Sequence, residues 1–151
     1  MQNLQLYTRF INKMYDVSNA IHQYESIPRT YGSEIKLYMK EMHTIARIYE
    51  EPGITLSEIA DIENKTRSCL SQRINKLEKK GLIQKIKSQD EYKKTNLFVT
   101  DHGRMVAEYH ARLDERNYSR VMEHLNKWSE HEFEKYIELL SIVEDSVLAD
   151  C

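Results

Sequence analysis

Hydrophobic side chains recur at helical spacing along most of the chain, beginning near its first residues. The first stripe alternates steps of three and four residues and consists of Tyr7, Phe10, Met14, Val17, Ile21 and Tyr24. Such spacing, which resembles the a and d positions of a coiled coil, predicts a helix with one apolar seam that ends near Ile27-Pro28. We expect the seam to pack on a partner helix, and an internal core stripe is the alternative.

A second helix is predicted between a break at Tyr31-Gly32-Ser33 and a stop at Pro52-Gly53. Its inner face is expected to carry Met42, Ile45, Ala46 and Tyr49.

The next segment predicts a short helix, a tight turn and a third helix. Thr55 and Glu58 match a capping box, in which each side chain satisfies a backbone donor at the start of a helix. Residues 63–65 supply the turn, and a helix then runs from about Thr66 to Lys80 before Gly81 ends it in the left-handed conformation. The apolar positions of this third helix are Leu70, Ile74 and Leu77.

After Gly81 the periodicity changes. Residues 82–87 and 95–100 are rich in β-formers and are joined by a polar stretch, which predicts a hairpin. Thr100-Asp101 then caps a long helix, and a second capping box at Ser129-Glu132 opens a last one. The expected fold class is mainly α with a small β-hairpin: a winged helix-turn-helix over residues 33–100, flanked by helical dimerisation regions at 1–30 and 101–151.

Composition narrows the class of protein. With 151 residues, one compact unit is expected. No apolar run is long enough to cross a membrane, and the first residues lack the basic and apolar parts of a signal peptide, so we expect a cytoplasmic location without membrane contact. No glycine-rich phosphate loop, nucleophile motif or close carboxylate pair is present, so we do not expect an enzyme, and no cofactor is expected.

Charge is distributed unevenly. The whole chain carries −2, but residues 64–94 hold ten basic and three acidic side chains, a local charge of +7 that leaves −9 elsewhere. A short cationic segment in an anionic protein is typical of a surface that binds a polyanion, although a solvated charged face is the alternative.

The third predicted helix turns a polar face away from its apolar stripe, with Ser68, Gln72, Asn75 and Lys79 pointing outward. Amide side chains can pair with adenine, and arginine can reach guanine or phosphate, so this face suits the major groove of double-stranded DNA. An ordinary polar helix surface is the alternative. The residues predicted to contact DNA are Thr66, Arg67, Ser68, Ser71, Gln72, Asn75, Lys76, Lys79, Lys87, Lys93 and Lys94.

Residues 54–103 resemble the winged-helix core of the MarR (multiple antibiotic resistance regulator) family. The resemblance rests on residues 77–83 at the junction of helix and wing, on 57–60 in the first helix of the motif, and on 97–103 after the wing. It implies a homodimeric repressor or activator that binds palindromic DNA and is released by a small-molecule effector. The chain departs from the family at Glu63 and Lys65, which replace apolar residues, and in the wing, where Asp90, Glu91 and Lys93 replace Asp-x-Arg.

Histidine and tyrosine side chains are candidates to line an effector pocket: Tyr15, Tyr38, His43, Tyr109 and His110. Each is more often a packed side chain than a ligand contact. Zinc-sensing members of the family take ligands from the second helix and from an i, i+4 pair on the fifth. By that resemblance His43, His110 and Asp114 are candidate zinc ligands, with no metal as the preferred interpretation.

Cys69 is interpreted as a small packing residue within the third helix. A winged helix that binds protein rather than DNA is the alternative function, and it would lack the steep salt dependence expected of DNA binding.

Overall fold

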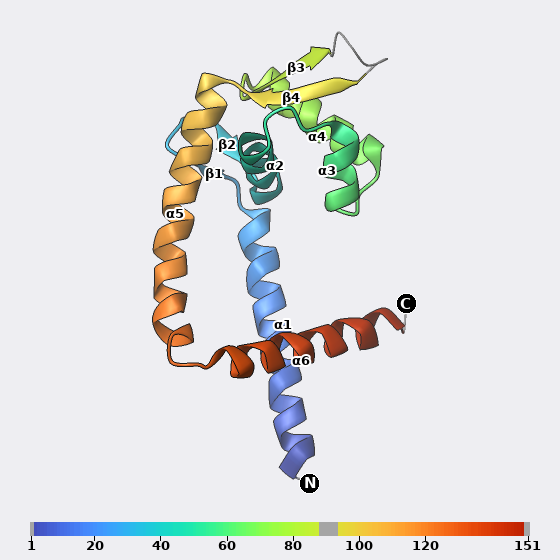
Figure 1. Cartoon of the computed structure of the whole chain (residues 1–151), viewed down its shortest axis with the longest axis vertical. Coiled ribbons are helices and arrows are strands. Elements are labelled where there is room, and N and C mark those ends of the chain that lie inside the picture. The colour runs from blue at the N-terminus through green and yellow to red at the C-terminus, as the bar shows by residue number, and fades with distance from the viewer. Residues whose placement is uncertain (1, 88–93, 150–151) are drawn as a thin grey trace. The chain divides into compact units, whose positions relative to one another are not determined.

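The computed structural model describes residues 2–87 and 94–149, and it confirms a mainly helical chain with a small β-hairpin. Its elements, shown in Figure 1, are α1 (Gln2–Ser26), β1 (Arg29–Thr30), β2 (Lys36–Leu37), α2 (Met39–Glu50), α3 (Leu56–Ile62), α4 (Arg67–Lys79), β3 (Ile83–Lys87), β4 (Thr95–Val99), α5 (Asp101–Leu125) and α6 (Glu130–Ala149). They form two compact units, one that ends at His110 and one that begins at Ala111.

A short two-stranded ribbon, which the sequence pattern did not predict, follows α1. Strands β1 and β2 pair antiparallel, with Arg29 opposite Leu37 and Thr30 opposite Lys36. The connection between them passes Gly32, whose φ of +67° is in the left-handed region that favours glycine. The expected break at residues 31–33 is therefore the turn of this ribbon.

Helix α2 buries the side chains of Met42, Ile45 and Ile48 completely. The predicted inner face was partly wrong: Ala46 is half-buried, and Tyr49 is 37% exposed. The reason is that α2 also buries two polar residues, Glu41 and Thr44, on the side of the helix away from Ala46 and Tyr49, so the centre of the buried face is shifted.

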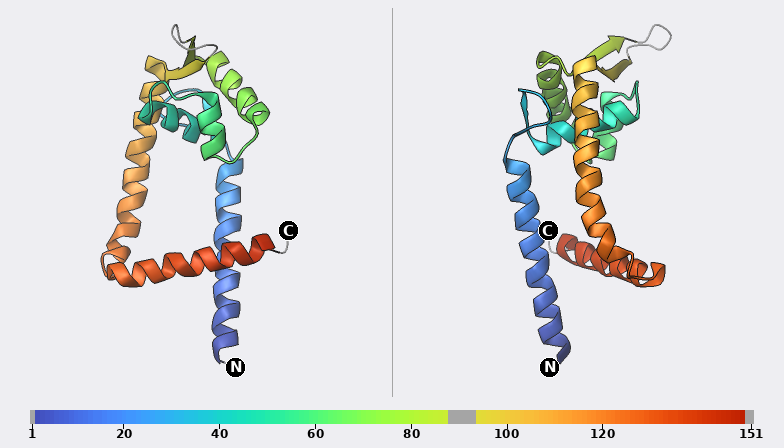
Figure 2. Two further views of the ribbon diagram at one scale, coloured as in Figure 1. Left: turned by 45° about the vertical axis from the view of Figure 1, so that its right-hand side comes forward. Right: turned by 90° about the vertical axis from the view of Figure 1, so that its left-hand side faces the viewer.

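Helices α3 and α4 contact each other and form the expected helix-turn-helix, which the two views in Figure 2 also show. The Thr55 N–H donates to Glu58 Oε2 at 2.7 Å and the Glu58 N–H donates to Thr55 Oγ1 at 3.3 Å, which confirms the capping box. In the turn, Asn64 adopts a φ of +49°, a conformation that asparagine tolerates better than most residues. The Lys65 N–H then bonds the Ala60 carbonyl at 2.9 Å, which closes the end of α3.

The wing begins directly after α4. Gly81 has a φ of +70°, which confirms the left-handed end predicted for this helix. The N–H groups of Gly81 and Leu82 bond the carbonyls of Glu78 and Leu77, which is a Schellman motif. Strands β3 and β4 pair antiparallel from Ile83 opposite Val99 to Lys87 opposite Thr95. The predicted wing tip at residues 88–93 lies outside the described residues.

Helix α5 starts against the wing. Thr100 Oγ1 accepts the Gly103 N–H at 3.1 Å and donates to the Gly81 carbonyl at 2.7 Å, which confirms Thr100 as the cap. Val106, Ala107 and His110 are buried in the first unit. This unit therefore includes the first turns of α5, which belong to the predicted dimerisation region.

The second unit holds the rest of α5 and α6. The capping box at Ser129 is confirmed, since the Ser129 N–H donates to Glu132 Oε2 at 2.8 Å and the Glu132 N–H donates to Ser129 Oγ at 3.3 Å. No side chain of α6 is buried among the described residues. Across residues 2–87 and 94–149, no helix has the length and apolar character needed to span a bilayer.

Candidate nucleic-acid interface

Helix α4 separates an apolar face from a polar one, as its sequence predicts. Leu70, Ile74 and Leu77 are completely buried. The four side chains predicted to point outward, Ser68, Gln72, Asn75 and Lys79, are all exposed. Burial of the apolar face against the rest of the first unit therefore fixes which polar groups α4 presents to a partner.

The remaining predicted contact residues lie near this face or on the wing. Thr66 is the N-cap of α4, and its Oγ1 accepts the Cys69 N–H at 3.3 Å. Ser71 is half-buried, whereas the other described members of the set are exposed: Thr66, Arg67, Lys76, Lys87 and Lys94. Lys93 lies outside the described residues.

Several of the described cations in residues 64–94 form ion pairs within the first unit, among them Arg73, Lys76, Lys80 and Lys85. Arg73 Nη1 lies 2.6 Å from Glu63 Oε2 and 3.0 Å from Thr44 Oγ1. Lys85 Nζ donates to Glu78 Oε2 at 2.7 Å and also to Asn75 Oδ1. Lys76 and Lys80 both bind Glu41.

Glu41 and Glu63 lie before residue 64, so the local charge of +7 overstates the positive charge that remains available. Of the described cations in residues 64–94, those that are exposed and form no ion pair or side-chain hydrogen bond within residues 2–87 and 94–149 are Lys65, Arg67, Lys79 and Lys87. These four lie at the start of α4, on its outer face and on β3.

Glu41 is a functional candidate that the sequence pattern missed. Its carboxylate is buried, with Lys76 Nζ 2.9 Å from Oε1 and Lys80 Nζ 3.1 Å from Oε2, and it also accepts the Tyr38 N–H at 3.0 Å. Burial alone raises the pKa of Glu41, but the bonds from Lys76, Tyr38 and Lys80 outweigh it and lower the pKa below the ordinary 4.5. The only sequence signal was an acidic residue beside Met42 on the inner face of α2.

The predicted effector-pocket residues are brought together only in part. The rings of His43 and His110 stack with their centroids 5.8 Å apart, and the Tyr31 ring lies 5.4 Å from His110. Tyr109 adjoins the same turn, because a Cβ added to Gly32 would lie 2.7 Å from its ring.

Tyr38 and Tyr15 have different surroundings. The Lys76 Nζ lies 5.5 Å from the centroid of the Tyr38 ring, whereas Tyr15 is exposed on α1. Among the residues that the structure describes, no group of three or more His, Cys, Asp or Glu side chains is arranged to hold a metal ion. Asp114 belongs to the second unit.

Cys69 is exposed on α4. The interpretation of this residue as a packing side chain was wrong, because position 69 directly precedes the buried Leu70 and therefore lies at the edge of the outer face.

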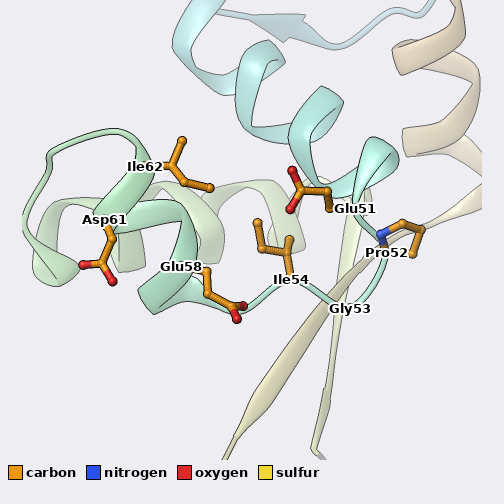
Figure 3. Close-up of a pocket in the computed structure, with 7 residues that line it drawn as sticks. All are labelled: Glu51, Pro52, Gly53, Ile54, Glu58, Asp61 and Ile62. Carbon is orange, nitrogen blue, oxygen red and sulfur yellow. The ribbon is translucent and has the colours of Figure 1, made fainter.

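A groove of about 580 Å³ lies between the end of α2 and α3 (Figure 3). Its lining is Glu51, Pro52, Gly53, Ile54, Glu58, Asp61 and Ile62. Arg47 Nη1 binds the Glu51 carboxylate at 3.2 Å, and the Glu58 carboxylate is used in the capping box. An acidic groove repels a polyanion, so it does not extend the candidate interface.

A helix-turn-helix whose second helix exposes amides and cations, followed by a two-stranded wing, defines a winged-helix protein of the DNA-binding type. Residues 37–94 match the model of the MarR family, which confirms the resemblance inferred from the sequence. The match covers most of the winged-helix region of this chain.

A relative found by sequence agrees with this match. An uncharacterised helix-turn-helix transcriptional regulator of Bacillus subtilis, YybA, is 32% identical over 82 residues, which are 54% of this chain and 55% of that protein. The match therefore spans about half of that relative.

Solved structures share the fold over nearly the whole chain. Streptococcus pneumoniae FabT in complex with DNA has a TM-score of 0.70 at 24% identity, over 96% of this chain and 99% of FabT. The zinc-responsive MarR family member ZitR of Lactococcus lactis has a TM-score of 0.73 at 19% identity, over 94% of this chain and 99% of ZitR.

Proposed function

We propose that this protein is a sequence-specific DNA-binding transcription regulator that acts as a homodimer on a palindromic operator, in the manner of a ligand-responsive repressor. The observation that carries the proposal is the outer face of α4, where Arg67, Gln72 and Lys79 are exposed and keep their donors available within the described chain. The matched family and the DNA-bound FabT structure support it.

Base reading is assigned mainly to Gln72. An amide can form two hydrogen bonds with adenine only if both its oxygen and its nitrogen are available. Asn75 Oδ1 already accepts a bond from Lys85, so one of the two lone pairs of this oxygen is occupied and the amide is held toward Lys85. Gln72 has no such partner among residues 2–87 and 94–149, and Arg67 at the start of the helix suits guanine or a phosphate.

Exposed apolar side chains support the homodimer. On α1 they include Leu4, Tyr7, Val17 and Ile21, and in the second unit Phe133, Tyr136, Ile137, Leu139, Ile142, Val147 and Leu148. Large apolar surfaces of this kind mark protein interfaces, and we assign both, in the regions 1–30 and 101–151, to a second copy of the chain. A dimer would hold two copies of the 33–100 region about 34 to 36 Å apart, one turn of DNA.

The proposal is tested by selecting binding sites from random DNA duplexes with the purified protein, and by measuring its mass in solution by light scattering. A dimer that enriches a palindrome, with affinity that falls steeply as salt rises, is the expected result. A monomer that ignores duplexes even at low salt would refute the proposal, and salt-insensitive capture of a protein would favour the alternative winged-helix interaction module.

Regulation by zinc is a second candidate, because the side chains of His43 and His110 lie near each other, with their ring centroids 5.8 Å apart. Repeating the operator titration with added zinc tests it, with His43→Ala as the matched variant. An operator affinity that zinc leaves unchanged would remove this candidate and retain the small-molecule effector.

A further inference from the structure

The ion pairs around Glu41 connect the buried side of the winged helix with its outer face. Glu41 comes from α2, near its N-terminus, whereas its two lysine partners lie one turn apart near the end of α4. Each oxygen of the carboxylate accepts from Lys80, at 3.2 and 3.1 Å, and Oε1 also binds Lys76 at 2.9 Å. One buried carboxylate therefore fixes two side chains of α4.

The two lysines are not equivalent. Lys80 Nζ also donates to the Lys36 carbonyl at 3.0 Å, and its side chain is only 22% exposed. An ammonium has three donors, and the contacts of Lys80 with the Lys36 carbonyl and the Glu41 carboxylate occupy them. Lys80 is consequently directed inward.

Lys76 keeps an open side. Its side chain is 54% exposed, and the Nζ lies between Glu41 Oε1 and the ring of Tyr38, 5.5 Å from the ring centroid. Two ammonium groups share one carboxylate, so the cluster retains one net positive charge, and Lys76 is its exposed member. The lowered pKa of Glu41 keeps the carboxylate ionised at neutral pH.

We propose that Glu41 is a positioning residue for DNA binding: it holds the Lys76 ammonium in one orientation on the outer face of α4, ready to receive a DNA phosphate. The inference rests on the proposed function. A free lysine loses rotamer freedom when it binds, and an ammonium that is already held at its place avoids part of this cost.

The test compares Glu41→Gln with Glu50→Gln on a mixed-sequence DNA duplex, since a phosphate contact does not depend on base sequence. Glu50 is exposed on the same helix and forms no side-chain bond within residues 2–87 and 94–149, so this control removes an equal charge without touching the cluster. We expect Glu41→Gln to weaken binding about fivefold relative to the control. The slope of log affinity against log salt should fall by about one unit.

A double-mutant cycle separates positioning from stability. In a Lys76→Gln background, Glu41→Gln should have no further effect on affinity or salt slope, because its action passes through Lys76. An effect of Glu41→Gln equal to that of Glu50→Gln, a tighter complex, or an undiminished effect in the Lys76→Gln background would each overturn the inference.

Folding is checked by circular dichroism at the binding temperature. If Glu41→Gln does not fold, Glu41→Asp, which keeps the charge but shortens its reach, replaces it in the same cycle. Lys76→Gln with an unchanged salt slope also overturns the inference, whichever variant folds. A wild-type protein that binds no duplex would instead refute the proposed function itself.

Discussion

Arg73 on α4 and Glu63 at the end of α3 form an ion pair of 2.6 Å in which both side chains are largely buried. Thr44 of α2 joins them, since Arg73 Nη1 donates to its hydroxyl at 3.0 Å. Glu63 stands where the MarR family usually has an apolar residue, and the structure gives the reason. At this position an ion pair with Arg73 takes the place of an apolar contact and joins the end of α3 to α4.

Removing Glu63 should destabilise the fold because Arg73 would keep a buried charge without its partner. We expect Glu63→Ala to lower the free energy of unfolding by about 3 kcal/mol, measured by urea denaturation. Asp16→Ala is the control, since its pair with Lys13 is solvent-exposed and should contribute less than about 1 kcal/mol. Equal losses in the two variants would show that the Glu63 pair is no more stabilising than a surface pair.

Gly103 is required for close packing of α5 on Leu82, in the connection between α4 and β3. A Cβ at this position would lie 1.9 Å from the Leu82 carbonyl oxygen, and the backbone cannot move aside as a side chain could. We expect Gly103→Ala to cost about 3 kcal/mol in thermal or urea unfolding. A Cβ added to Gly81 would meet no atom within 4 Å, and only the positive φ of this residue would strain an alanine there. Gly81→Ala should therefore lower the free energy of unfolding by about 1 kcal/mol. The reverse order would contradict this explanation.

Local signals made the helix-turn-helix and the wing predictable. Capping boxes at Thr55 and Ser129 involve residues three apart, and the end of α4 at Gly81 requires only a left-handed residue. Helical periodicity alone predicted which side chains form the outer face of α4. Each of these features is decided by neighbours in the sequence.

Contacts between distant segments were not predictable from the same patterns. Glu41 lies on α2, far from Lys76 and Lys80 in the sequence. The charge count over residues 64–94 therefore did not include the carboxylate that neutralises part of their positive charge. The β1–β2 ribbon is too short to produce an alternating pattern. Exposure of Cys69 and the shifted inner face of α2 likewise depend on tertiary packing.

Gln72 is predicted to read a base. We expect Gln72→Ala to cost about 1 to 3 kcal/mol on the preferred operator and to relax specificity at one position, because both hydrogen bonds to the base are lost. A competition assay between the operator and single-base variants measures this. Gln23→Ala, which removes an exposed amide from α1, is the control. Unchanged discrimination by Gln72→Ala would reject the role.

Lys87 on β3 is predicted to contact the DNA backbone. Lys87→Ala should weaken binding to all sequences about equally and should lower the salt slope by about one unit, as should Lys93→Ala. Binding of a selected and an unrelated duplex is measured over a range of salt concentrations. Lys13→Ala on α1 removes an equal charge away from the motif and should leave the slope unchanged. A wild-type slope in Lys87→Ala would exclude the contact.

Acid should weaken the capping box that opens α3. Bonds from the Thr55 N–H, then from the Thr55 hydroxyl, lower the pKa of Glu58 below 4.5, and the charge of Lys94 adds to this. A carboxyl whose pKa is lower in the folded state contributes stability above its unfolded pKa and loses it as pH falls through the folded pKa.

Glu58→Gln keeps an acceptor for the cap but cannot titrate, so it should be less stable than wild type at pH 7, with a difference that closes in acid. Urea unfolding between neutral pH and about pH 3 measures the difference, with Asp61→Asn on the same helix as the control. A gap between wild type and Glu58→Gln that stays constant over this range would mean that the charge of Glu58 does not stabilise the helix.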